Sequence, residues 1–203
     1  MGIFDKVVSA VTPLESDEER RTAREKARAA AGSNDWLSLV LQHHVQIETA
    51  FDAVRASHDA ASARSALQEL ATVLTGHSNA EESVIYPALA MLGEKSDATA
   101  GYTEQAAAKT EAAQLETLDP LSQDFADKLA HLRGAVLHHM YEEESERFLE
   151  LKQKAPQADQ VRLTQRFREE FERYVGSDAS WRSVSAGTTP RAGDLRPFPG
   201  ASH

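Results

Sequence analysis

The chain has 203 residues, a formal net charge of −10 at pH 7 and no cysteine. This length suits one domain with an ample hydrophobic core, and the missing cysteines exclude disulfides, zinc fingers and iron–sulfur clusters. The negative charge argues against nucleic acid as a partner, and the abundant alanine with only 6% aromatic residues favours an all-α fold.

Residues 1–13 carry a small apolar stripe that ends at Pro13. The stripe has too little basic charge for a helix on a membrane surface, so we expect it to pack against the rest of the chain or against a second copy in a homodimer. No apolar run approaches membrane-spanning length, and the N-terminus lacks a secretory pattern. The sequence therefore predicts a soluble, cytoplasmic protein with no membrane partner.

Two helices are predicted before residue 60. A charged, alanine-rich helix spans residues 15–31 and ends at Gly32, since glycine is the preferred residue just after a helix. Asp35 can cap the next helix, which runs to about residue 57. This second helix is the first of a predicted bundle.

Two further bundle helices follow in the middle of the chain. One spans residues 62–92, with Pro87 as a predicted kink and Gly93 as its end. The next spans residues 96–118, so the chain reverses direction at each short turn.

The last predicted helices complete the bundle. Asp119-Pro120 resembles a helix cap followed by proline at the first helical position and would open the fourth bundle helix. Beyond Pro156 the apolar pattern predicts a fifth helix that folds back over the bundle. We therefore expect an N-terminal helical extension over residues 1–34, a bundle with a C-terminal packing helix over 35–175, and a flexible tail over 176–203.

In three of the bundle helices a histidine precedes a glutamate by four residues. Such pairs include His44/Glu48, His77/Glu81 and His139/Glu143. At about 100° per residue, positions four apart share one helical face. In each helix the pair falls within the apolar stripe, where polar groups are costly unless something satisfies them. Either the pairs converge on a metal site, or they bond only with one another in a metal-free bundle.

In an antiparallel helix pair, residues at equal distances from the turn lie at the same height. This symmetry indicates which residue of the third helix lies level with the His/Glu pairs. Reflecting Glu81 through Gly93 gives position 105, and reflecting His139 through the turn at residues 119–122 gives nearly the same position. Both estimates indicate Gln105.

Three segments that contain these residues, 43–48, 77–87 and 138–145, resemble the hemerythrin / HHE cation-binding family. The resemblance covers roughly residues 35–153. It implies an up-down-up-down four-helix bundle with a non-haem di-iron centre, two iron ions per chain. It also implies the ligands: His44, His77 and His139 as nitrogen donors, and Glu81 and Glu143 as bridging carboxylates.

One position departs from the family pattern. The third helix of the family normally supplies a histidine, whereas the aligned residue here is Gln105, a weak neutral ligand. One metal ion would then be lost or bound more weakly. Glu48 is the natural compensating ligand, since it lies one turn from His44, and Tyr102 would supply a phenolate or a supporting hydrogen bond.

The remaining histidines and acidic residues receive simpler interpretations. We expect His131 on the surface, and His43 and His138 as flanking residues that point away from the site. The acidic residues beside the ligands would form a solvated face or accept hydrogen bonds from the imidazoles; these are Glu82, Glu142 and Glu144.

The predicted chemistry is that of a carboxylate-rich iron site, with manganese and zinc as alternatives. More oxygen donors favour redox turnover, so the leading hypothesis is a di-iron protein that reacts with O₂ or peroxide in oxidative stress defence. A non-catalytic sensor of iron, O₂ or NO that acts through a partner is the second hypothesis. The sequence leaves open whether the protein is an enzyme.

Overall fold

The structure, a computed structural model, describes residues 15–176. The predicted apolar stripe of residues 1–13 and the tail beyond residue 176 lie outside this range. The predicted all-α fold is confirmed, because the described residues form helices and no strand. None of these helices combines the length and the apolar character needed to cross a membrane.

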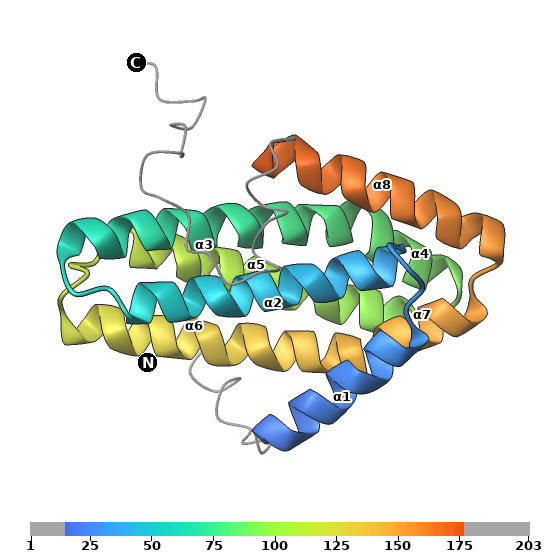
Figure 1. Ribbon diagram of the computed structural model, residues 1–203, viewed down its shortest axis with the longest axis horizontal. Helices are drawn as coiled ribbons and strands as arrows, with labels where there is room; N and C mark the ends of the chain where they lie inside the picture. Colours follow the sequence, from blue (N-terminus) through green and yellow to red (C-terminus); the bar gives the residue numbers. More distant parts are fainter. Residues whose placement is uncertain (1–14, 177–203) are drawn as a thin grey trace.

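Long helices that run up, down, up and down form the predicted bundle (Figure 1). In chain order they are α2 (Trp36–Arg55), α3 (Ala60–Ala80) continued by α4 (Tyr86–Met91), α5 (Lys95–Leu115), and α6 (Gln123–Glu142) continued by α7 (Phe148–Lys154). The largest side chains between them are fully buried, and Trp36 meets the edge of Phe148 with ring centroids 5.7 Å apart. This apolar core surrounds a polar centre at mid-height.

Two π-helical turns interrupt the second and fourth bundle helices, at Glu81–Ile85 and Glu143–Arg147. The first lies just before Pro87, which lacks an N–H and cannot form a regular helical bond; the N–H of Tyr86 bonds instead to the carbonyl of Glu81. The predicted kink at Pro87 is thus a π turn. The second π turn contains no proline, and both begin at a predicted ligand.

Two outer helices flank the bundle. α8 (Gln157–Val175) packs along α3 and α2, as expected for a helix that folds back over the bundle. α1 (Asp17–Ala30) lies obliquely over the junction of α6 and α7, against the second π turn (Figure 1). α1 begins with a capping box, in which Ser16 and Glu19 bond each other's backbone N–H groups.

Two helices begin after caps that differ from those expected from the sequence. Asp59 caps α3, which therefore begins at Ala60 rather than at residue 62. Ser122, not Asp119, caps α6 by accepting a hydrogen bond from the N–H of Phe125 at 3.1 Å. Asp119 instead accepts from the N–H of Leu121 at 3.1 Å and so closes the preceding turn.

Gly101 on α5 gives the ring of Tyr86 room to lie at the bundle axis. A Cβ at position 101 would lie 2.7 Å from Tyr86 Cζ, and the ring cannot shift freely because its hydroxyl is hydrogen-bonded. We expect Gly101→Ala to lower the free energy of unfolding by about 1–3 kcal/mol through overpacking. The helical Gly134 has nothing within 4 Å of such a Cβ, so Gly134→Ala should raise it by about 0.5–1 kcal/mol. Urea denaturation of both variants tests this; equal effects would contradict it.

Candidate metal centre

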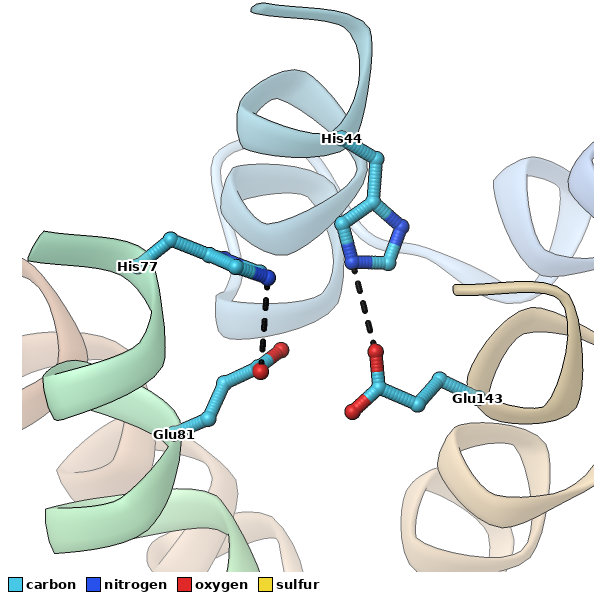
Figure 2. A group of neighbouring side chains, drawn as sticks. All are labelled: His44, His77, Glu81 and Glu143. Atoms are coloured by element: carbon cyan, nitrogen blue, oxygen red, sulfur yellow. Dashed lines mark ion pairs between the residues drawn. The ribbon is translucent and has the colours of Figure 1, made fainter. Parts of the chain in front are cut away.

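Four buried side chains converge at mid-height in the bundle (Figure 2). His44 comes from α2, His77 from α3, and Glu81 and Glu143 are the first residues of the two π turns. One nitrogen or oxygen atom from each lies within 4.8 Å of the others, and all four residues are at most 2% exposed. The structure thus brings together four of the six predicted ligands.

Each of these four side chains has at least one buried polar atom without a hydrogen-bond partner. His44 Nε2 lies 3.4 Å from Glu143 Oε2, and His77 Nε2 lies 3.3 Å from Glu81 Oε2. Neither histidine nitrogen has a hydrogen-bond partner, and the same holds for Glu81 Oε1 and Glu143 Oε2. Buried polar atoms are otherwise almost always paired. Imidazole nitrogens and carboxylate oxygens suit a divalent first-row metal ion, so the residues fit such an ion.

A second set of donors lies on the other side of the two carboxylates, around His139. Its Nε2 lies 3.3 Å from Glu143 Oε1 and 3.2 Å from the hydroxyl of Tyr86. The Tyr86 hydroxyl donates to Glu143 Oε1 at 2.9 Å, and Gln105 Nε2 donates to Glu81 Oε2 at 2.6 Å. Glu143 Oε1 and Glu81 Oε2 are therefore engaged here, although Glu81 Oε2 also faces His77, whereas Glu143 Oε2 and Glu81 Oε1 have no hydrogen-bond partner.

Gln105 lies where the reflection through the turns placed it, buried at the height of the ligands. Tyr86, by contrast, was missed by the sequence reasoning. Residues five apart in a regular α-helix point about 140° away from one another, so Tyr86 seemed to face away from Glu81. The π turn adds one residue to the helical turn and brings the two together. Pro87 was the signal that could have indicated this.

Glu48 and Tyr102, the two residues expected to compensate for Gln105, lie elsewhere. Glu48 does not join the group: its carboxylate is 31% exposed and pairs with Arg24 of α1 at 2.6 Å. Glu48 was predicted as a compensating ligand, but α1 places Arg24 at the outer face of α2, and Glu48 pairs with this arginine instead. The Tyr102 hydroxyl donates to the backbone carbonyl of Glu82 at 2.7 Å, so it supports the first π turn from outside the centre.

Carboxylates orient two of the imidazoles. Glu144 lies 2.7 Å from His44 Nδ1, and Glu104 lies 2.6 Å from His139 Nδ1. A ring that donates through Nδ1 keeps Nε2 as the donor atom for a metal. Glu144 thus accepts a hydrogen bond from an imidazole, which is one of the two roles expected for it. Glu104, next to Gln105, was not among the predicted residues.

The charges explain the protonation of the histidines. Burial lowers the pKa of His44, but the nearby carboxylates of Glu143 and Glu144 outweigh this effect and raise the pKa to about 9. The carboxylates likewise raise the pKa of His139 to about 10 against the effect of burial. Burial and the neighbouring His44 lower the pKa of His77 well below its usual value. His77 is therefore a neutral imidazole at neutral pH.

The two carboxylates differ in the same way. Burial and the charge of Glu143 raise the pKa of Glu81 to about 8. For Glu143, burial is outweighed by the nearby imidazoles of His139 and His44, which lower its pKa. Glu143 is thus the more readily ionised member of the pair, and a nearby positive charge would favour the ionised form of Glu81.

The flanking histidines play other roles. His43 stacks on Phe171 of α8 with ring centroids 3.6 Å apart, and burial lowers its pKa to about 3. His138 bonds Glu15 at 2.7 Å, and the half-exposed His131 bonds Glu111 at 2.9 Å. None of the three belongs to the four-residue group.

A cavity of about 190 Å³ borders the centre between α3, α5 and α6. It touches His77, Gln105 and His139, and much of its wall is apolar. The apolar lining residues are Leu74, Ala107, Ala108, Ala135, Val136 and Met140. A small neutral molecule of a few atoms could therefore reach the polar groups from this side.

These features define an all-α protein with a metal-binding centre of imidazoles and carboxylates inside a four-helix bundle. Residues 37–151 match the model of the hemerythrin HHE cation binding domain, and the chain belongs to this family. The predicted resemblance is confirmed. The match begins after α1 and ends before α8.

A curated relative and the solved structures add little detail. A protein named "DNA nickase" from Nostoc sp. (strain PCC 7120 / SAG 25.82 / UTEX 2576) is 26% identical over 110 residues. The aligned part covers 54% of this chain and 31% of that protein, so the match spans about a third of the relative's length. No solved structure matches the chain.

Proposed function

We propose that this protein is a non-haem iron protein that binds O₂ or peroxide and reacts with it, with a role in oxidative stress defence. The observation that carries the proposal is the group of four buried donors with unpaired, mutually facing atoms, next to a small apolar cavity. Iron held there would supply electrons and a Lewis-acidic position for a small oxygen-containing molecule.

The chain's residues divide the centre into two unequal positions. His44, His77, Glu81 and Glu143 would hold the first ion, and His139 with the opposite carboxylate oxygens would hold the second. The first position offers unpaired donor atoms, whereas the oxygens facing the second already accept hydrogen bonds from Tyr86 and Gln105. We therefore expect one tightly bound and one weakly bound ion, with manganese or zinc as replacements.

The surrounding residues would orient the ligands and hold protons. Glu144 and Glu104 fix the ring orientation of His44 and His139 through their Nδ1 atoms. The Tyr86 hydroxyl is a fully buried hydrogen-bond donor at the second position. Burial and the nearby charges of Glu143 and Glu81 raise its pKa well above the usual value, so it keeps its proton.

Metal analysis and optical spectroscopy test the proposal. Protein purified without oxygen should contain more than one iron per chain after loading with Fe²⁺, and its visible absorption should change and recover through repeated additions of peroxide. Apo protein prepared with a chelator is the control. Failure to retain iron would overturn the proposal. Bound iron that responds to neither O₂ nor peroxide would overturn the proposed reaction and support metal binding alone.

The cavity gives a separate prediction for the reaction. Ala108 lines the cavity, while Ala106 on the same helix is exposed on the outer face. Ala108→Phe should fill part of the cavity and slow the reaction with peroxide about tenfold or more, without loss of iron, because access is restricted. Stopped-flow absorption measures the rate. Ala106→Phe should react like the unmodified protein; equal rates in both variants would contradict this route.

A second candidate is a non-catalytic sensor of iron, O₂ or NO. One observation favours it: Arg24 of the outer helix α1 contacts a carboxylate that touches His44. The DNA-directed activity in the relative's name is not carried over, because the matched part is 31% of that protein and a net charge of −10 opposes binding to a polyanion. A cytoplasmic location and a homodimer stay predictions.

A further inference from the structure

α1 lies outside the segment that matches the family model, yet it reaches the metal centre through a single carboxylate. We propose that Arg24 is a positioning residue of the centre: it holds Glu144, which orients His44, so that docking of α1 and metal binding stabilise each other. This inference rests on the proposed function, because it requires that His44 bind a metal ion.

The chain of contacts is continuous. Arg24 Nε donates to Glu144 Oε1 at 2.9 Å and to Oε2 at 3.1 Å, and Arg24 Nη2 lies 2.8 Å from Oε1. The same Oε1 lies 2.7 Å from His44 Nδ1. Glu144 is 1% exposed while α1 is docked, so its carboxylate depends on these protein partners. Arg24 thereby holds a buried carboxylate in position against the ring, and the ring presents Nε2 to the centre.

The opposite side of the centre repeats this arrangement. Arg147 Nη1 donates to Glu104 Oε2 at 3.0 Å, and this oxygen lies 2.6 Å from His139 Nδ1. One arginine, one glutamate and one histidine thus form the same sequence of contacts at each end. Arg147 and Glu104 lie within the matched segment, whereas Arg24 does not. The arginine that supports His139 therefore comes from the bundle itself, whereas the arginine that supports His44 comes from the outer helix α1.

The remaining contacts of α1 are few enough for this one to matter. Ala23 and Ala27 are the buried residues of the helix, Arg24 also pairs with Glu48 of α2 at 2.6 Å, and the preceding Glu15 bonds His138 at 2.7 Å. A 14-residue helix is marginal without tertiary contacts. Loss of the contact between Arg24 and Glu144 should therefore weaken the packing of α1 against the bundle. Coupling between two sites is reciprocal, so a metal ion that fixes His44 and Glu144 should also hold α1 in place.

Three variants test the inference. Arg24→Gln should weaken Fe²⁺ binding about 10–100-fold, as is typical for loss of a residue that supports a ligand. Arg24→Lys should recover part of this loss, since lysine keeps one charged contact. Arg21→Gln removes an exposed arginine from the same helix and should leave binding unchanged. Competition with a chromophoric chelator under anaerobic conditions gives the affinities.

A double variant distinguishes positioning from general loss of stability. If Arg24 acts through Glu144, Arg24→Gln combined with Glu144→Gln should lose no more Fe²⁺ affinity than the larger of the two single changes. Losses that add would overturn the inference, because they would mean that the two residues act independently.

Hydrogen exchange of residues 17–30 supplies the reciprocal measurement. In the unmodified protein, Fe²⁺ should slow exchange in α1; in Arg24→Gln, exchange should be faster and no longer respond to Fe²⁺. If the protein binds iron and reacts with peroxide while α1 exchange and the affinity of Arg24→Gln stay unchanged, this inference fails and the proposed function stands. If the protein binds no iron, both fail.

Discussion

Replacing His77 by leucine is expected to abolish tight metal binding and, at the same time, to make the metal-depleted protein more stable. His77 is a neutral, 2% exposed imidazole with two nitrogen atoms that lack hydrogen bonds. Its loss as a direct donor should cost more than the roughly 10–100-fold that loss of a supporting residue costs. Removing buried unpaired polar atoms should raise the free energy of unfolding by about 1–2 kcal/mol.

The opposite signs of these two effects make the test decisive. A histidine that served only to hold the bundle together would destabilise it when removed, with or without metal. Urea denaturation with a chelator present gives the first quantity, and Fe²⁺ titration gives the second. Added Fe²⁺ should raise the melting temperature of the unmodified protein and not that of His77→Leu, because binding to the folded state alone stabilises it.

His131→Leu is the matched control on α6. This histidine is half exposed and bonds Glu111 on the surface, so its replacement should change stability by less than about 0.5 kcal/mol and leave the iron content unchanged. A metal-depleted His77→Leu protein that is less stable than the original, with its iron retained, would show that the inward His/Glu pairs are structural.

Helix periodicity and turn symmetry were enough to locate much of this site from the sequence. The i, i+4 spacing predicted that His77 and Glu81 share a face, and they lie 3.3 Å apart. Reflection through the turns predicted the height of Gln105, which bonds Glu81. Both inferences depend only on local geometry and on antiparallel packing, which a regular bundle preserves.

The missed residues depend on features that periodicity does not contain. Tyr86 joins the centre because a π turn changes the helical register after Glu81, and such turns recur at functional sites. Glu48 turns away because Arg24, from a helix outside the bundle, pairs with it. Arg24 lies 120 residues from Glu144 in sequence. A contact over that separation follows from tertiary packing rather than from any local pattern.

Restoring a histidine on the third bundle helix should make the centre bind its second ion tightly. In Gln105→His an imidazole would replace an amide that now donates to Glu81 Oε2 at 2.6 Å and to the Tyr86 hydroxyl at 2.7 Å. The cavity borders position 105, so the ring has space on that side. We expect the second equivalent of Fe²⁺ to bind about tenfold or more tightly, since imidazole is a much stronger donor than an amide.

Gln105→Leu separates the added donor from the lost amide, because leucine has a similar size and no donor atom. It should keep the first ion, held by His44, His77 and the two carboxylates, and show no tighter binding of the second. Anaerobic titration with Fe²⁺, monitored by calorimetry, gives the stoichiometry of metal binding for all three proteins. If the unmodified protein already binds two ions with equal affinity, Tyr86 and Gln105 do not weaken the second position. If histidine and leucine behave alike, the second position does not draw on position 105 at all.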